Sequence, residues 1–327
     1  MNKKFMSPKL QRRQTKKILL TGSIAYDRIM NFSGYFKDNI LPNQIHNLNV
    51  SFFVHELKES FGGTAGNIGY NLALLGERPY ILANVGSNDF DKYEKWFKKN
   101  NINLSLINKI KNQQTASAYI ITDKSDNQIT GFYPGAMLKK ITTNTIAQKN
   151  IDIAVISAQN PIDMTKLSKI FRSKKIKFIF DPGQQVSSLS GNDLKYCING
   201  SYILIGNDYE INLISKKTGL SISELLKNTD IIIATLGEEG SMIYTKDMEY
   251  KIAPAKPKNT SDPTGAGDAY RAGLIKGIIE NWPIEKACKF ASVVSVYTVE
   301  KYGTQTHKFS IASIKKRYFE NFKEKLI

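Results

Sequence analysis

The chain has 327 residues, of which 41% are hydrophobic, which is enough to form a large buried core. Its net charge is +17, but outside the N-terminal tail it has no long basic helix and no interleaved aromatic stripe, so we expect no nucleic-acid partner. No apolar run approaches the roughly 20 residues that cross a bilayer, and no secretory-signal pattern is present; we therefore expect a cytoplasmic protein without a membrane partner.

The first 16 residues are rich in Lys and Arg, and we expect them to form a disordered tail before a single domain over residues 17–327. The run KILLTGSIAYD predicts a buried strand that opens the fold and ends at Asp27. Similar runs recur as YILANVG, IDIAVISA, IKFIFDPG, SYILIGN and DIIIATLG. Each ends in small, polar or turn residues, as expected for parallel strands buried on both faces.

Segments with helical spacing alternate with these strands, and the chain is mainly helical from Gly265 onward. This alternation predicts an α/β fold with a doubly wound, mainly parallel sheet flanked by helices, whose ligands bind at the carboxyl ends of the strands. Two regions break the alternation and predict a small β-sheet lid, the second as a hairpin around residues 124–127. The predicted helices are 67–75, 93–99, 163–173, 209–217 and 222–226, and the predicted lid segments are 44–59 and 115–132.

The segment NTSDPTGAGDAYRAG, residues 259–273, combines a turn with a helix that begins near Asp268. The N–H groups of Gly265, Ala266 and Gly267 at a helix N-terminus can bind a phosphate. A carboxylate there would repel a resting phosphate, so Asp268 is best explained as a base that accepts the proton of an attacking hydroxyl. The alternative is a helix cap, in which Asp268 satisfies amide donors.

A second glycine-rich segment, FGGTAGNIGYNLALLG, covers residues 61–76. Gly62 and Gly63 allow the backbone to approach a ligand, and Asn67 offers both a donor and an acceptor to the hydroxyls of a polyol ring. Asp27 can bind a diol through its two oxygens. The alternative is structural: the glycines pack a helix, Asn67 is its N-cap and Asp27 is a solvated turn residue.

The pair GGTAGN and DPTGAGD, in this order and together with Asp27, resembles the ribokinase family, also called the PfkB carbohydrate kinase family. The likeness covers nearly the whole chain after residue 17. It implies a ribokinase-like fold with a β-sheet lid, ATP as phosphoryl donor and Asp268 as general base. By the same resemblance, an anion hole is formed by Gly265, Ala266 and Gly267, and substrate hydroxyls are held by Asp27, Gly63 and Asn67.

Two further motifs resemble the nucleotide-binding parts of this family. Asn207 and Glu210 form an Asn-x-x-Glu motif, which by resemblance organises Mg²⁺ and its waters around the ATP phosphates. In ATLGEEG, the residues Thr235, Gly237 and Gly240 resemble the family's nucleotide-binding loop. No GxxxxGK[ST] sequence is present, which argues against a P-loop kinase. Relatives often need a monovalent cation such as K⁺, but the sequence does not place its site.

The substrate depends on the lid, whose segments are more similar to the adenosine kinase-like branch than to ribokinase itself. In that branch an aromatic lid residue packs on the base, and the candidates here are Phe132, Phe52 and Tyr119. An aromatic residue in a strand can equally belong to the core. We therefore predict phosphorylation of a nucleoside, adenosine to AMP, as in purine salvage. The alternatives are a ribokinase- or fructokinase-type sugar kinase and a ligand-sensing or nucleic-acid-binding protein. The protein is expected to be a monomer or a homodimer formed through the lid.

Overall fold

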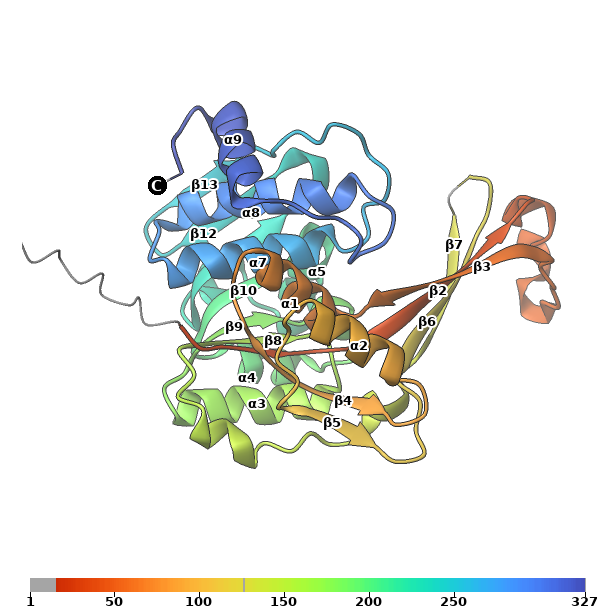
Figure 1. The fold of residues 1–327 in the computed structure, drawn as a ribbon, viewed down its shortest axis with the longest axis horizontal. Helices are drawn as coiled ribbons and strands as arrows, with labels where there is room; N and C mark the ends of the chain where they lie inside the picture. Colours follow the sequence, from red (N-terminus) through yellow and green to blue (C-terminus); the bar gives the residue numbers. More distant parts are fainter. Residues whose placement is uncertain (1–15, 126, 327) are drawn as a thin grey trace, which may run out of the picture.

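The computed structural model describes residues 16–125 and 127–326 and contains two β-sheets of different size (Figure 1). The predicted basic tail therefore lies outside the described residues, apart from Lys16, whose Nζ lies 3.1 Å from Asp152 Oδ1. No helix in this described part of the chain is long and apolar enough to cross a membrane.

Among the described residues, the large sheet has nine strands in the order β13-β12-β11-β10-β9-β8-β1-β4-β5. Neighbouring strands run parallel from β5 through β11, and β12 and β13 continue the sheet as antiparallel strands. The predicted parallel strands are confirmed, whereas β5, β12 and β13 were not predicted. The bounds are β1 Ile18–Thr21, β4 Tyr80–Gly86, β5 Ile107–Ile110, β8 Ile153–Ser157, β9 Lys177–Asp181, β10 Ser201–Asn207, β11 Thr229–Thr235, β12 Ser241–Thr245 and β13 Glu249–Ile252.

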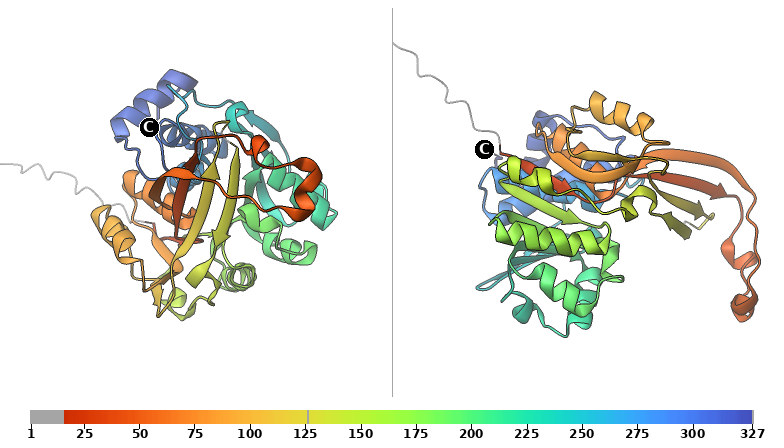
Figure 2. Two further views of the ribbon diagram at one scale, coloured as in Figure 1. Left: turned by 90° about the vertical axis from the view of Figure 1, so that its right-hand side faces the viewer. Right: turned by 90° about the horizontal axis from the view of Figure 1, so that it is seen from below.

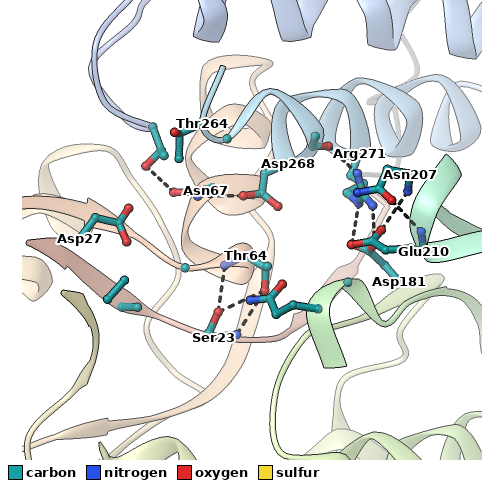
Figure 3. A pocket seen from close by; sticks show the side chains of 18 of the residues that line it. Ser23, Asp27, Thr64, Asn67, Asp181, Asn207, Glu210, Thr264, Asp268 and Arg271 are labelled. Atoms are coloured by element: carbon teal, nitrogen blue, oxygen red, sulfur yellow. Dashed lines mark hydrogen bonds and ion pairs between the residues drawn. The ribbon is translucent and has the colours of Figure 1, made fainter. Parts of the chain in front are cut away.

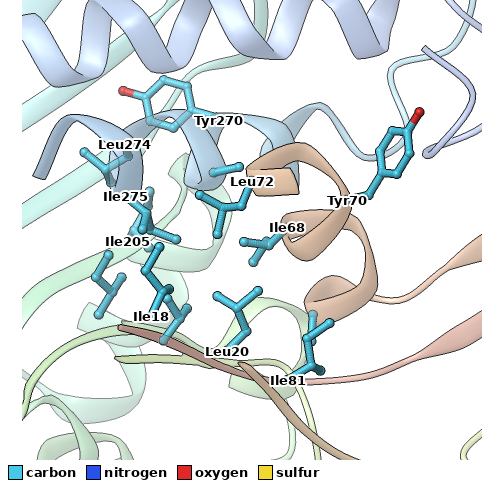
Figure 4. Packing of buried hydrophobic residues seen from close by; sticks show 14 of the residues in the cluster. Ile18, Leu20, Ile68, Tyr70, Leu72, Ile81, Ile205, Tyr270, Leu274 and Ile275 are labelled. Carbon is cyan, nitrogen blue, oxygen red and sulfur yellow. The ribbon is translucent and has the colours of Figure 1, made fainter. Parts of the chain in front are cut away.

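Helices cover both faces of this sheet, as predicted, because successive side chains of a buried strand point to opposite faces. In β1, Ile18 and Leu20 pack under α1 and α7, as Figure 4 shows, whereas Leu19 joins the core under α3 and α4. The predicted helices are confirmed to within a few residues. The bounds are α1 Thr64–Leu74, α2 Asp91–Lys99, α3 Pro161–Ser173, α4 Gly191–Ile198, α5 Asp208–Thr218, α6 Ile222–Leu225, α7 Ala266–Ile279, α8 Ile284–Val299 and α9 Ile311–Phe322.

The small sheet projects from the large domain and has the strand order β3-β2-β6-β7 among the described residues (Figures 1 and 2). Its strands β6 and β7 form the predicted hairpin, whose turn is held by Asp123 Oδ1, an acceptor for the backbone N–H groups of Ser125 and Asn127. The bounds are β2 Ala25–Phe32, β3 Val54–Gly62, β6 Ala116–Thr122 and β7 Gln128–Tyr133.

Two sequence-based expectations about the lid are wrong in detail. The run KILLTGSIAYD is not one strand: β1 ends at Thr21, Ser23 N–H donates to the carbonyl of Ala158, and the chain then enters the small sheet as β2. Asp27 therefore lies within a lid strand and not at the end of the first strand of the large sheet. The predicted lid segment 44–59 overlaps a 3₁₀ turn at Pro42–Asn47, and its strand begins only at Val54.

Candidate active site

A cleft of about 590 Å³ lies where the small sheet meets the carboxyl ends of the large-sheet strands (Figure 3). The large domain supplies its lining from the ends of β9, β10 and β11 and from the N-termini of α1 and α7. Most of the predicted site residues line this cleft: Asp27, Gly63, Asn67, Phe132, Asn207, Glu210, Thr235, Gly237, Gly265, Gly267 and Asp268. Three predicted residues are not among the lining residues: Gly62, Ala266 and Gly240.

The side chains of Asn67 and Asp268 meet directly between the two helix N-termini. Asn67 Nδ2 donates to Asp268 Oδ2 at 2.8 Å, although the residues lie 201 positions apart in the chain. Neither side chain caps its own helix, because the N-cap of α1 is Gly63 and that of α7 is Gly265, both without a side-chain cap. The capping alternatives for Asn67 and Asp268 are therefore wrong.

Asn67 is held in place by the loop that follows α8. Its Oδ1 accepts hydrogen bonds from Thr304 Oγ1 at 2.8 Å and from Gln305 Nε2 at 2.9 Å. Both partners are almost fully buried. Sequence reasoning missed them, because nothing in YGTQT distinguishes them from an ordinary loop. The fixed amide leaves the Nδ2 group aimed at Asp268.

The first turn of α7 presents unpaired amide donors to the cleft. Gly265 has φ +80°, a left-handed conformation that favours glycine, and a Cβ there would lie 2.9 Å from Thr304 side-chain atoms. Ala266 N–H donates to the Pro263 carbonyl and is not free, which differs from the expected three-donor anion hole. The N–H groups of Gly265 and Gly267 have no hydrogen-bond partner among the described residues. A helix N-terminus with free donors is favourable for an anion.

Asp268 and Asp27 both have raised pKa values. Burial raises the pKa of Asp268 to about 7, with smaller raising contributions from Asp181 and Asp27 that are opposed by the Asn67 hydrogen bond and by Arg271. Burial, aided by Asp262, raises the pKa of Asp27 to about 6. A carboxylate that titrates near neutral pH is suited to general base catalysis.

Gly62 and Gly63 are required by how the chain packs. A Cβ at Gly62 would lie 2.2 Å from Asp27 Oδ2, so this glycine makes room for the carboxylate on the neighbouring strand. Gly63 has φ +87°, and its Cβ would lie 2.6 Å from the Ala25 backbone nitrogen. Gly63 also lines the cleft, whereas Gly62 acts on it only through Asp27.

Asn207 and Glu210 form a reciprocal capping box at the start of α5. Asn207 Oδ1 accepts from Glu210 N–H at 2.7 Å, and Glu210 Oε2 accepts from Asn207 N–H at 2.8 Å. Burial, with Asp181 nearby, raises the pKa of Glu210. The described residues contain no group of three His, Cys, Asp or Glu that could hold a metal ion. A lone carboxylate fits Mg²⁺ that is bound mainly by waters and substrate phosphates.

The ATLGEEG segment is divided by the structure. Thr235 ends β11 and donates to the Gly206 carbonyl at 3.4 Å, and Gly237 follows with φ +59°. Both line the cleft. Gly240 lies instead in the turn before β12, where a Cβ would lie 2.0 Å from the Ile252 carbonyl oxygen. Its glycine is explained by this close backbone approach.

Of the three aromatic lid candidates, Phe132 lines the cleft, and its side chain is 44% exposed. Phe52 packs against Phe32 and Phe36, with ring centroids 5.0 Å apart in each case. Tyr119 accepts a hydrogen bond from Arg28. The lid thus offers one exposed ring to the cleft among these candidates.

Several lining residues were missed by sequence reasoning. Asp181 ends β9 in IKFIFDPG and is bound by Arg271 of α7. It could have been found, because it follows a buried strand in the same way as Asn207 follows β10. The other missed lining residues are mostly small or polar: Ser23, Ala25, Thr64, Ala118, Thr130, Gly183, Gln184, Thr264 and Thr304.

A large, mainly parallel α/β sheet, a four-stranded lid and a cleft that joins a carboxylate to a helix N-terminus define the ribokinase-like fold. The model of the pfkB family of carbohydrate kinases matches residues 17–310. The chain therefore belongs to this family, as its two glycine-rich motifs predicted.

The chain is similar to several nucleoside kinases. It is 31% identical over 294 residues to the nucleoside kinase of Methanocaldococcus jannaschii, with 89% of this chain and 93% of that protein covered. The nucleoside kinase of Burkholderia thailandensis in complex with inosine superposes with a TM-score of 0.84 at 32% identity, covering 94% of this chain and 99% of that one. Its complex with ADP-inosine has the same TM-score at 34% identity, covering 94% and 97%.

Proposed function

We propose that this protein is an ATP-dependent nucleoside kinase that phosphorylates a purine nucleoside, with Asp268 as general base. The observation that carries the proposal is the contact between Asp268 and Asn67 beside the free amides of α7, in a cleft that also contains Asp27. Similarity to kinases solved with inosine and with ADP-inosine supports a nucleoside acceptor and an adenine nucleotide donor. Adenosine to AMP is the reaction predicted from the sequence, and inosine is a second acceptor of the same class.

The lid and the large domain have separate tasks in this proposal. Asp27 and Phe132 of the lid bind the nucleoside, Asp27 through the ribose hydroxyls and Phe132 by contact with the base. Asn67, oriented by Thr304 and Gln305, holds Asp268. The large domain binds ATP near Thr235 and Gly237, at the ends of its strands.

In the reaction, ionised Asp268 accepts the proton of the nucleoside hydroxyl while that oxygen attacks the γ-phosphorus of ATP; the bond from this phosphorus to the β,γ-bridging oxygen breaks, and ADP leaves with that oxygen. The N–H groups of Gly265 and Gly267 stabilise the charge on the transferred phosphoryl group. Asn207 and Glu210, with their waters, would hold Mg²⁺, which neutralises phosphate charge when bound. The lid covers the cleft and excludes water that would otherwise hydrolyse ATP.

The proposal is tested by measuring ADP release by the full-length protein with ATP and Mg²⁺, across adenosine, inosine, ribose and fructose. We expect the purine nucleosides to give the highest kcat/KM. Asp268→Asn should lower kcat by about 10²–10⁴-fold, the usual contribution of a general base, while both substrates still bind. Asp230→Asn, an exposed carboxylate at the start of β11, is the matched control and should retain activity. Near-normal turnover by Asp268→Asn, or a preference for ribose or fructose, would contradict the proposal.

A further inference from the structure

The charge of the cleft differs from that of the whole chain. The protein has a net charge of +17, yet the described residues that line the cleft include four carboxylates and a single cation. The cation is Arg271, and the carboxylates are Asp27, Asp181, Glu210 and Asp268. A site that receives the phosphates of ATP needs positive charge close to the reacting groups. The position of the Arg271 guanidinium therefore affects how readily the surrounding carboxyl groups ionise.

Arg271 is clamped between two elements of the large domain (Figure 3). Its Nε and Nη2 donate to the two carboxylate oxygens of Asp181 at 2.6 and 2.5 Å, and its Nη1 donates to the Gly267 carbonyl at 3.1 Å. Arg271 is 7% exposed and Asp181 is 3% exposed. A bidentate pair of this kind fixes the orientation of the planar guanidinium.

The pair also explains the glycine at position 267. A Cβ on Gly267 would lie 2.9 Å from Arg271 Nη1, so a side chain there would collide with the guanidinium. Arg271 thus ties the end of β9 to the first turn of α7, the turn that carries Gly265, Gly267 and Asp268. Buried ion pairs add little to stability on average, which favours a role for this pair in the site.

One charged side chain near Asp268 favours its ionised form, and two oppose it. Arg271 lies one helical turn along α7 and favours the carboxylate form, whereas Asp181 at the end of β9 and Asp27 on β2 disfavour it. Tyr93 of α2 also senses the charge of Asp268; its phenol is fully buried, and burial raises its pKa. Arg271 is therefore the cationic side chain that opposes the other charges.

We propose that Arg271 is a positioning residue for phosphoryl transfer: clamped by Asp181, it braces the first turn of α7 and keeps Asp268 ionised in a cleft that is otherwise anionic. This inference rests on the proposed role of Asp268 as general base. It assigns opposite effects to the two members of the pair, because the guanidinium favours the ionised base and the Asp181 carboxylate disfavours it.

The test compares Arg271→Gln with Asp181→Asn in the full-length protein, using the pH dependence of kcat. Arg271→Gln should move the acid limb of the profile to higher pH by roughly 1 unit, the usual effect of losing a neighbouring opposite charge. Arg271→Lys keeps the positive charge, so its acid limb should lie close to that of the wild-type protein. Asp181→Asn should move the limb to lower pH. The matched control is Arg172 at the end of α3, a partly exposed cation that does not line the cleft, since Arg172→Gln should leave the limb unchanged.

A purely structural role for Arg271 would lower kcat in Arg271→Gln without moving the acid limb, and that result would overturn the inference. A shift of the limb in the same direction by Arg271→Gln and Asp181→Asn would also overturn it. The double variant Asp181→Asn/Arg271→Gln leaves neither member of the pair as an unpaired buried charge and should fold where a single variant does not. The acid limb of the double variant should lie nearer to the wild-type pH than that of Arg271→Gln, because one favourable and one unfavourable charge are removed together.

The effect of Arg271 on the ionisation of Asp268 can also be measured without turnover. The NMR signal of the Asp268 carboxyl carbon is followed as a function of pH in the ligand-free protein. Asp268→Asn assigns the signal. Failure of the wild-type protein to phosphorylate any nucleoside would overturn the proposed function alone. An Asp268 titration that Arg271→Gln does not move would overturn the inference about Arg271.

Discussion

The two sheets of this protein differ in how far their strands are covered. Every residue of β8 in the large sheet is buried, whereas every residue of β7 in the lid is exposed. The large sheet therefore supplies most of the apolar burial that stabilises the fold. The lid leaves Thr130 and Phe132 of β7 in the cleft and places Ile129 among the exposed residues outside it. The difference teaches that, if the proposed roles of Asp27 and Phe132 hold, stability and substrate choice reside in separate parts of the molecule.

The chemistry follows the same division in our proposal. The base, the free amides and the Asn207–Glu210 cap all belong to the large domain, where the buried Asn67 holds the base and Asn207 and Glu210 hold each other. The lid contributes Asp27 and Phe132, which stand on a sheet that is covered less completely. A lid that carries substrate contacts is typical of enzymes that close over their ligands.

The largest expected difference between the large domain and the lid is in how a substitution changes the free energy of unfolding. Phe178 of β9 is fully buried and packs against Phe171, with ring centroids 5.9 Å apart. Phe178→Ala should lower the free energy of unfolding by about 3–5 kcal/mol, because it removes a large side chain from a close-packed core. Ile129→Ala on the lid should change it by less than about 0.5 kcal/mol. Denaturant titration of both variants measures the difference, and equal losses would break the division.

A smaller effect is expected on nucleoside binding. Phe132→Ala should weaken the binding of adenosine or inosine by about 1–3 kcal/mol, the usual contribution of a ring stacked on a base, and should leave ATP binding unchanged. Ile129→Ala, on the same strand but outside the cleft lining, is the matched control. Calorimetric titration with each ligand checks this. If both variants lose affinity for the nucleoside equally, Phe132 does not contact the base.

The smallest effect is a gain of stability at alkaline pH when Asp268 is replaced. The pKa of Asp268 is about 7 in the folded protein, against an ordinary value of 3.8, so the folded state holds this proton more tightly than the unfolded state. The resulting stabilisation is present below about pH 3.8 and is lost as the pH rises through 7. Asp268→Asn should therefore be more stable than the wild-type protein at pH 8, by on the order of 1–2 kcal/mol; this is less than the roughly 4 kcal/mol that the whole pKa shift represents, because the amide that replaces the carboxylate is desolvated as well.

Thermal unfolding at pH 5 and pH 8 measures this gain. The difference between Asp268→Asn and the wild-type protein should be clearly smaller at pH 5, where the carboxyl group is protonated in the folded state. Asp230→Asn, which changes an exposed carboxylate, is the control for this measurement. A gain for Asp268→Asn that is the same at both pH values would show that Asp268 is not strained by its surroundings.

The large domain could be predicted well from the sequence, and the lid only in part, because its hairpin was predicted but its first strand was not. The strands of the large sheet are uninterrupted apolar runs, since burial on both faces leaves no alternation to obscure them. In the lid, β2 follows β1 after only three residues, and the two strands read as one apolar run. The same limit applies to β12 and β13, which are short and only partly buried. The sequence therefore placed Asp27 at the end of a strand of the large sheet, whereas the structure places it in β2 of the lid.

By itself, the sequence determined the family, the α/β class and half of the residues that line the cleft, because glycine-rich turns and strand ends are local features with a local physical cause. Only the tertiary structure decided which of these residues touch. It joined Asn67 to Asp268 and Asp181 to Arg271, and it placed Gly240 and Phe52 away from the site. Such contacts depend on how distant elements pack, and no spacing along a single chain encodes the distance between two helices or the charge that one side chain senses from another.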